Sequence, residues 1–338
     1  MISSFSTSIT DLFGIRHPIL CGGLMWLADA KYVAAVVNAG AMGFITPRSF
    51  PSLEAFREQL ILAKKLTGGK PFGVNLYISG LPEQNHQLQK WVDISLEEGV
   101  RHFETAGYSP THLLPRLKNH SAVVIHKCTT IRHALRAERD GVDAISLIGA
   151  ECGGHPGTAV TSAFSLGALA NERLSIPFVI GGGIGTGKQL LSALALGANG
   201  ILIGSRMLVS TEIWAHQRYK EFLISLDENG TSTVLEPFRK TYRCLNNKTA
   251  QEVAALEKTG ERDFERYRPL IQGKKAFEAY KTGDYSQGIL SLGPAIAFAD
   301  RIEPAADILE RIVVEAKGAY EELQNIIVQP QSRDTNEL

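Results

Sequence analysis

Eight short apolar runs alternate with longer segments of helical spacing in the first two-thirds of the chain, and this repeat restricts the possible folds more than any other feature. Strands that alternate with helices pair in parallel, because each helix carries the chain back to the starting edge of the sheet. The runs span residues 18–23, 42–46, 72–78, 102–106, 122–128, 144–149, 178–183 and 200–205, with helical spacing between them, as at 30–38, 53–65, 131–139 and 187–196. The chain is therefore predicted to be an α/β protein.

Eight strand–helix units favour a closed (β/α)8 barrel, the TIM barrel, over an open doubly wound sheet. After residue 205 the composition changes, because residues 213–287 are more charged and read as several helices without strands, at 214–226, 248–258 and 267–280. An amphipathic segment at 304–323 suits the last helix of the barrel. We predict a barrel from residues 1–212 and 288–328, a helical substrate-lid subdomain at 213–287 inserted after strand eight, and a flexible tail at 329–338.

A glycine-rich loop follows the seventh run. Residues 182–188 fit the start of the triphosphate-binding motif G-x-x-x-x-G-K, but the serine or threonine required next is replaced by Gln189. No frame of the loop fits the dinucleotide motif G-x-G-x-x-G. In a (β/α)8 barrel, the loops after strands seven and eight often bind phosphate. We therefore predict a phosphate site at Gly182, Gly183, Gly204 and Ser205, against the alternative that these glycines only turn the chain into helices.

Residues at other strand ends indicate what carries the phosphate. Asn75 interrupts an apolar strand and could bind the polar edge of a ring. Lys127 shares a strand face with Val123 and Ile125, and could neutralise electron density on a reduced cofactor. The alternatives are an asparagine with partners in the core and a lysine that extends to solvent. Backbone amides after the first strand could contact a flat ring, or only form a turn, at Gly22, Gly23, Leu24 and Met25.

His155 lies in the glycine-rich segment 149–157 after the sixth run, at the end of the barrel where catalytic residues gather. A histidine suits general base catalysis because its ordinary pKa is near neutrality. The alternative is a solvent-exposed histidine without a catalytic role. We interpret Cys152 as a packing residue, and a single histidine without nearby carboxylates predicts no metal site.

Composition narrows the function classes. Lysine and arginine total 35, as do aspartate and glutamate, so no overall field favours nucleic acid as a partner. The four cysteines lack C-x-x-C spacing, which is typical of a reduced, cytoplasmic protein. The first residues lack the pattern of a secretory signal. The sequence has no run of about 18 apolar residues, so no membrane-spanning helix is predicted.

Several motifs together resemble the nitronate monooxygenase family, formerly called 2-nitropropane dioxygenases. The motifs are Gly22-Gly-Leu-Met-Trp26, Gly73-Val-Asn75, Glu151-Cys-Gly-Gly-His-Pro-Gly157, Gly181-Gly-Gly-Ile184 and Gly204-Ser-Arg206. The stretch Val124-Ile-His-Lys-Cys-Thr129 with Arg132-His-Ala-Leu135 is similar to a branch described as NADH:quinone reductases. The resemblance extends over nearly the whole chain.

The resemblance implies a flavoprotein: a (β/α)8 barrel that binds FMN beneath a helical lid. Gly22, Gly23, Leu24, Met25 and Asn75 would line the flavin ring, and Lys127 would lie near its polar edge. The phosphate would bind at Gly182, Gly183, Gly204 and Ser205, and His155 would face the substrate. Ile148 stands where relatives often carry a polar residue near the cofactor.

Three activities remain open on this resemblance, each with a small-molecule substrate. A nitronate monooxygenase oxidises alkyl nitronates with dioxygen to carbonyl compounds and nitrite. An NAD(P)H:quinone oxidoreductase would use NAD(P)H as co-substrate, and an FMN-dependent enoyl-thioester reductase shares the Gly-Gly-His motif. The non-enzymatic alternative is a flavin-binding barrel without turnover. Neither a nucleic acid nor a membrane partner is expected.

Overall fold

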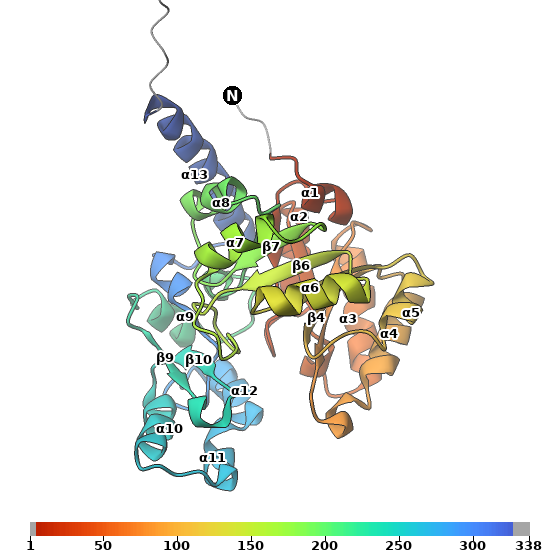
Figure 1. The fold of residues 1–338 in the computed structure, drawn as a ribbon. Coiled ribbons are helices and arrows are strands. Elements are labelled where there is room, and N and C mark those ends of the chain that lie inside the picture. The colour runs from red at the N-terminus through yellow and green to blue at the C-terminus, as the bar shows by residue number, and fades with distance from the viewer. Residues whose placement is uncertain (1–4, 327–338) are drawn as a thin grey trace, which may run out of the picture.

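The computed structural model describes residues 5–326, in which eight parallel strands close into a barrel, with β1 pairing with both β2 and β8 (Figure 1). The strands are β1 (Ile19–Cys21), β2 (Met42–Ile45), β3 (Gly73–Ile78), β4 (His102–Gly107), β5 (Val123–Cys128), β6 (Ala144–Ile148), β7 (Phe178–Gly181) and β8 (Ile201–Ile203). Each coincides with a predicted run, so the (β/α)8 fold is confirmed. The tail predicted at 329–338 lies outside the described residues.

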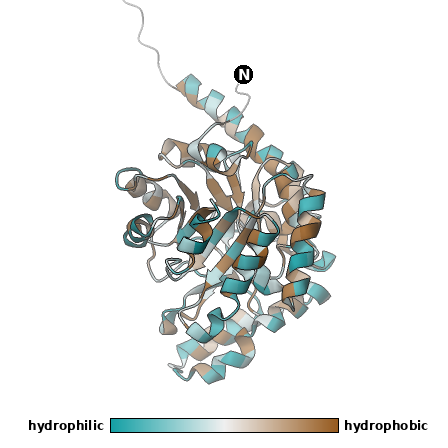
Figure 2. Cartoon of the chain, turned by 90° about the vertical axis from the view of Figure 1, so that its right-hand side faces the viewer, coloured by the Kyte–Doolittle hydropathy of each residue, from teal (hydrophilic) through white to brown (hydrophobic). Residues whose placement is uncertain are grey.

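Helices surround the barrel and place their apolar faces against it (Figure 2). The segment predicted at 304–323 is α13, which packs against the helices that follow β1 and β7 and so completes the outer ring. The outer helices are α2 (Ala30–Asn38), α3 (Leu53–Leu66), α4 (Leu88–Glu97), α5 (Leu114–Lys118), α6 (Ile131–Asp140), α7 (Ala163–Asn171), α8 (Gly187–Ala195) and α13 (Ala305–Ile326). Short 3₁₀ helices are η1 (Pro47–Ser49), η2 (Pro82–Asn85), η3 (Ser205–Val209), η4 (Glu236–Phe238) and η5 (Pro294–Phe298).

The amino end of the barrel is closed by α1 (Ser8–Phe13), an element that the sequence analysis did not predict. Thr7 starts this helix with a capping box, and Gly14 ends it in the left-handed conformation. The Phe13 ring lies 6.3 Å from the Phe44 ring and 5.4 Å from the His102 ring, between centroids. Because apolar side chains fill this end, a ligand is expected at the carboxyl ends of the strands, where (β/α)8 barrels carry their sites.

The segment after β8 forms a subdomain, and the prediction that it contains helices without strands is wrong. Strands β9 (Thr231–Val234) and β10 (Tyr242–Leu245) form an antiparallel pair. The helix predicted at 267–280 is two helices, because the backbone of Gln272 is extended between them. The subdomain helices are α9 (Gln217–Leu223), α10 (Lys248–Lys258), α11 (Phe264–Ile271) and α12 (Gly273–Thr282).

The hairpin forms because it buries side chains in a small core of its own. Val234 from β9 and Cys244 from β10 pack there with Val253 and Tyr267 from the subdomain helices. Figure 1 shows the subdomain at the end of the molecule opposite the N-terminus, facing the open end of the barrel. The boundaries proposed at 213 and 287 stay a prediction.

Candidate active site

A buried polar network lies inside the barrel near the carboxyl ends of the strands, which we call the mouth. Its centre is Glu104 on β4, whose side chain is completely buried. Glu104 Oε2 accepts hydrogen bonds from the backbone N–H of Gly23 at 2.9 Å and from Asn75 Nδ2 at 2.6 Å. Lys127 Nζ lies 2.9 Å from Glu104 Oε1 in an ion pair. Three predicted site residues therefore meet at one carboxylate that the sequence analysis did not name.

The two glycines after β1 leave room for this network. A Cβ atom at Gly22 would lie 2.9 Å from Lys127 Nζ, and one at Gly23 would lie 2.4 Å from Asn75 Cβ. The lysine turns into the barrel, on the face of β5 that also carries Ile125, instead of extending to solvent. Gly22 and Gly23 thus allow the network to approach the first strand.

The glycine loop after β7 presents free backbone donors. Gly182 and Gly183 have φ angles of 104° and 70°, which side chains rarely tolerate. Among residues 5–326, the N–H groups of Gly183 and Gly204 donate no hydrogen bond to the protein, whereas the strand register directs the Gly182 N–H toward Leu202 O. Ser205 Oγ accepts from Gly293 N–H at 2.8 Å, which leaves its own O–H free to donate. These partly exposed donors suit an anion.

Gln189, whose presence broke the triphosphate motif, shapes this loop. Its Oε1 accepts hydrogen bonds from Gly185 N–H at 2.8 Å and Thr186 N–H at 3.2 Å, and its Nε2 donates to Gly183 O at 2.8 Å. Lys188 instead faces outward, with Nζ 3.5 Å from the exposed carboxylate of Glu322 on α13. The glutamine therefore supports the loop from within, and the lysine belongs to the surface.

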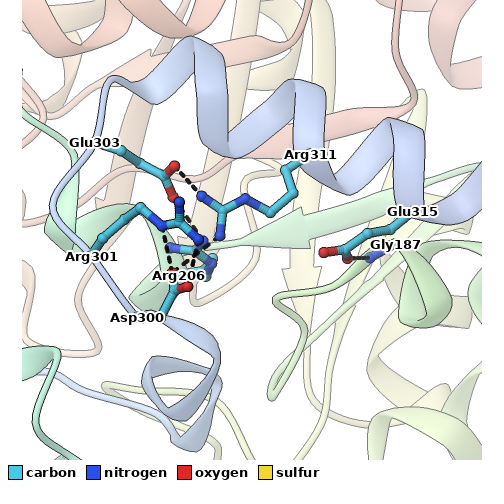
Figure 3. A network of polar contacts seen from close by, with 7 residues as sticks. All are labelled: Gly187, Arg206, Asp300, Arg301, Glu303, Arg311 and Glu315. Carbon is cyan, nitrogen blue, oxygen red and sulfur yellow. Dashed lines mark hydrogen bonds and ion pairs between the residues drawn. The ribbon is translucent and has the colours of Figure 1, made fainter.

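A buried ion-pair network lies behind the loop (Figure 3). Arg206, which directly follows Ser205, is almost completely buried, and its Nη2 donates to Glu303 Oε1 at 3.0 Å. Arg311 on α13 also binds Glu303 and pairs with Asp300 at 3.1 Å. This network joins the end of β8 to the segment that returns from the subdomain.

His155 lies at the mouth between two tyrosines. Its ring is 4.5 Å from the Tyr242 ring, edge to face, and 6.5 Å from the Tyr77 ring, between centroids. The surrounding protein lowers its pKa to about 4, mainly by excluding bulk water and secondly through the charge of Lys240. The side chain itself is still exposed, and the lowered pKa leaves the imidazole of His155 neutral at pH 7.

The subdomain holds the loop that carries this histidine. Gly154 N–H donates to Arg243 O at 2.9 Å, and Arg243 N–H donates to Gly154 O at 2.7 Å. The hydroxyl of Tyr242 is hydrogen-bonded to Ser291 Oγ. The hairpin that the sequence analysis missed thus supplies both a ring beside His155 and the backbone that positions it.

The residues at the mouth fit a cofactor with a phosphate group and a polar ring. Thr46 Oγ1 and Ser146 Oγ are buried and find no hydrogen-bond partner within residues 5–326, and Ser146 neighbours Lys127 in the strand register. Buried polar atoms of this kind normally have a partner, which a bound ring would supply. The loops after β7 and β8 offer the donors that a phosphate needs.

Two predicted ring contacts lie at the edge of this arrangement. Leu24 approaches Gly204, where an added Cβ would lie 3.7 Å from Leu24 Cδ2, and thereby connects the two parts of the mouth. Met25 is 38% exposed, and its sulfur accepts a hydrogen bond from Ser49 at 3.8 Å.

Burial raises the pKa of Cys152 to about 12, which agrees with its interpretation as a packing residue.

Other features of residues 5–326 add no further site. No group of three histidine, cysteine, aspartate or glutamate side chains in this range could hold a metal ion. A surface cavity of about 310 Å³ on α12 is walled by charged and polar side chains, and no predicted site residue lines it. Every helix in the range is too short or too polar to span a bilayer.

Glu104 and Tyr242 are the important residues that the sequence analysis missed. Glu104 interrupts a β-like run in the same way as Asn75 and Lys127, so the same rule would have found it. Tyr242 carried no such signal, because its segment was read as helical.

Comparison with known proteins agrees with the fold and identifies the family. The nitronate monooxygenase family model matches residues 6–315. A "(3aS,4S,5R,7aS)-5-hydroxy-7a-methyl-1-oxo-octahydro-1H-indene-4-carboxyl-CoA dehydrogenase" from Rhodococcus jostii is 30% identical over 77% of this chain and 70% of the relative. A probable nitronate monooxygenase from Staphylococcus saprophyticus is 27% identical over 67% of this chain and 74% of the relative.

The solved structure of FabK from Thermotoga maritima superimposes with a TM-score of 0.88 at 28% identity, over 96% of this chain and 100% of that one. The match of the family model covers the barrel strands, the subdomain and the first half of α13. The chain therefore belongs to the nitronate monooxygenase family, a family of oxidoreductases.

Proposed function

We propose that this protein is an FMN-dependent oxidoreductase of the nitronate monooxygenase type, which oxidises alkyl nitronates with dioxygen to carbonyl compounds and nitrite. The observation that carries the proposal is the neutral, exposed His155 at the barrel mouth, in a segment that packs against the glycine loop and its free anion donors. A base and an anion cradle at the carboxyl ends of the strands are what a phosphate-bearing cofactor and a proton-bearing substrate require.

The two parts of the mouth would hold the two ends of FMN. Backbone N–H groups of Gly183 and Gly204, with the Ser205 hydroxyl, would bind its phosphate, and Gly182 would leave room for it beside them. Its ring would lie against Gly22, Gly23, Leu24 and Met25, with Asn75 and Lys127 at its polar edge. When bound, FMN would supply electron transfer between the substrate and dioxygen.

His155 would handle the proton of the substrate. A neutral imidazole can remove the acidic proton beside the nitro group of a nitroalkane, or donate its N–H to a nitronate oxygen. Tyr77 and Tyr242 flank the ring and would limit the access of water to it. Both phenols stay protonated, because burial raises the pKa of each.

The subdomain at 213–287 would serve as the substrate lid. Its strand β10 contacts the His155 loop through two backbone hydrogen bonds, so movement of the hairpin would move the histidine.

The four cysteines are unpaired, which supports a reducing, cytoplasmic location.

The test is nitrite release. Purified protein reconstituted with FMN is incubated in air with an alkyl nitronate and separately with the neutral nitroalkane. We expect nitrite from both substrates. FMN-loaded protein that gives no nitrite from either one would rule out this activity.

Two other reactions have support of their own. The similarity of residues 124–135 to NADH:quinone reductases supports reduction of a quinone by NAD(P)H. The carboxyl-CoA dehydrogenase from Rhodococcus jostii supports a thioester substrate, as in the enoyl-thioester reductase hypothesis. Anaerobic mixing with NADH, NADPH or a nitronate shows which reductant bleaches the flavin within the time of a turnover. Adding a quinone or an enoyl-thioester to the reduced protein then shows which acceptor restores the oxidised flavin, and so separates the two reductase activities.

A further inference from the structure

Glu104 is the most deeply buried carboxylate in the part of the chain that the structure describes. Its side chain has no exposed surface, and both of its oxygens are directed to residues at the mouth. It contacts Gly23, Asn75 and Lys127 from three different strands or strand ends. A buried carboxylate is costly unless it is paired and hydrogen-bonded, so its contacts here demand an explanation.

We propose that Glu104 is a positioning residue that sets the charge and the hydrogen-bonding direction of the site facing the cofactor ring, an inference that rests on the proposed binding of FMN. It does so through two neighbours. It compensates the charge of Lys127, and it fixes which end of the Asn75 amide faces the ring.

The charge argument follows from the ion pair. Lys127 Nζ and Glu104 Oε1 are 2.9 Å apart, and the pair as a whole is neutral. A lysine alone at this position would stabilise the negative charge of a reduced ring, because opposite charges attract strongly where water is excluded. With Glu104 present, most of that attraction is cancelled. The pair therefore keeps the ring harder to reduce than Lys127 alone would.

The orientation argument follows from Asn75. Its Nδ2 donates to Glu104 Oε2 at 2.6 Å, and a carboxylate can only accept. The amide is thereby held with its nitrogen toward Glu104. Its Oδ1 accepts no hydrogen bond from any residue in the described range, and is the end left for a ligand. Asn75 therefore presents an acceptor, which selects an N–H group on the ring.

The experiment measures the flavin midpoint potential in FMN-loaded wild-type protein and in Glu104→Gln, Lys127→Met and the double variant. We expect Glu104→Gln to raise the potential, because it leaves the ammonium uncompensated. Lys127→Met should lower it, and the double variant should return it close to the wild-type value. If Glu104→Gln fails to fold, the contrast between Lys127→Met and the double variant still tests the compensation.

Asp143→Asn is the matched control. Asp143 also pairs with a lysine, Lys118, and accepts a backbone hydrogen bond from Val124 N–H at 2.7 Å, but it lies at the amino end of the barrel. It should affect stability and leave the potential unchanged. A potential that is the same in wild type, Glu104→Gln, Lys127→Met and the double variant would overturn the proposal.

The outcomes separate this inference from the proposed function. FMN binding and the expected order of potentials without nitrite release would refute only the nitronate activity. Nitrite release with unchanged potentials would refute only the role of Glu104. Wild-type protein that binds no FMN would overturn both.

Discussion

The two halves of the barrel mouth are built in different ways. On the side of β7 and β8, the groups available to a ligand are backbone N–H groups of glycines, and charged side chains lie behind them. On the side of β1 to β5, the groups are side chains, with a carboxylate, an ammonium and an amide bonded to one another. Backbone N–H groups can bind an anion regardless of the charge of the neighbouring side chains. Ionisable side chains, in contrast, can change the net charge that a bound ligand experiences.

Because of this difference, mutations in the two halves are expected to change different properties of the protein. Changes in the glycine half should alter affinity for the cofactor, because its groups only bind. Changes in the side-chain half should alter how readily the bound ring is reduced. His155 belongs to neither half, and its replacement should alter turnover alone.

The largest effect is expected for His155→Ala. Loss of a general base typically lowers the rate by about 10²- to 10⁴-fold. We expect this loss in nitrite release from the neutral nitroalkane and a smaller one from the nitronate anion, which needs no deprotonation. His133→Ala on the exposed face of α6 is the control and should be as active as wild type. Equal losses on both substrates would contradict a role as base.

Arg206→Ala tests what lies behind the glycine half. Removing one partner of a buried ion pair leaves Glu303 with less compensation, and typically costs about 3 kcal/mol of unfolding free energy. Thermal or denaturant unfolding measures the loss. Arg301→Ala is the control, because Arg301 pairs with Asp300 at the surface, where an ion pair contributes little to stability, and the loss should be much smaller than for Arg206→Ala. Similar losses in both variants would argue against a special role for the buried pair.

Gly183→Ala should damage the cradle itself. At a φ of 70° a side chain is strained, and its Cβ would lie 3.1 Å from that of Glu151. We expect a stability loss of about 1–2 kcal/mol and a weaker affinity for FMN, measured by flavin fluorescence. Gly260→Ala has a φ of 80° with open space around its Cβ, and should share the strain without the loss of affinity.

Replacing each of the adjacent residues Gln189 and Lys188 shows which of the two side chains stabilises the glycine loop. Gln189→Ala removes the side chain that binds three groups of the glycine loop and should cost about 1 kcal/mol, as the loss of a helix cap does. Lys188→Ala removes an exposed ion pair and should change stability by less than about 0.5 kcal/mol. A larger effect at Lys188 would mean that the lysine contributes to the cradle.

The smallest expected effect is that of pH on the rate of turnover. Because the pKa of His155 is lowered below its ordinary value, the neutral base is present at neutral pH and is lost only as pH falls below the ordinary histidine range. The rate on a neutral nitroalkane should therefore vary little between roughly pH 6 and 8 through this group. A fall in the rate near the ordinary histidine pKa of about 6.5 would show that water reaches the imidazole of His155 more freely than we infer.

The barrel could be predicted because each strand occupies its own apolar run and each helix follows in order. The subdomain hairpin could not, because β9 and β10 are short strands that bury only Val234 in one and Cys244 and Leu245 in the other. The positions of Asn75 and Lys127 at the mouth followed from polar residues in apolar strands. That they meet at Glu104 depends on the strand register, which periodicity alone does not reveal.

The hydrogen bond between Ser205 and Gly293 joins residues 88 positions apart and has a consequence for the assembly of the protein. The glycine half of the mouth is supported by a segment that the ribosome makes only after the whole subdomain. A nascent chain that ends before residue 293 would lack this support, so stable retention of the cofactor would come late in folding. A chain that keeps its flavin would thereby report that both its barrel and its subdomain have folded.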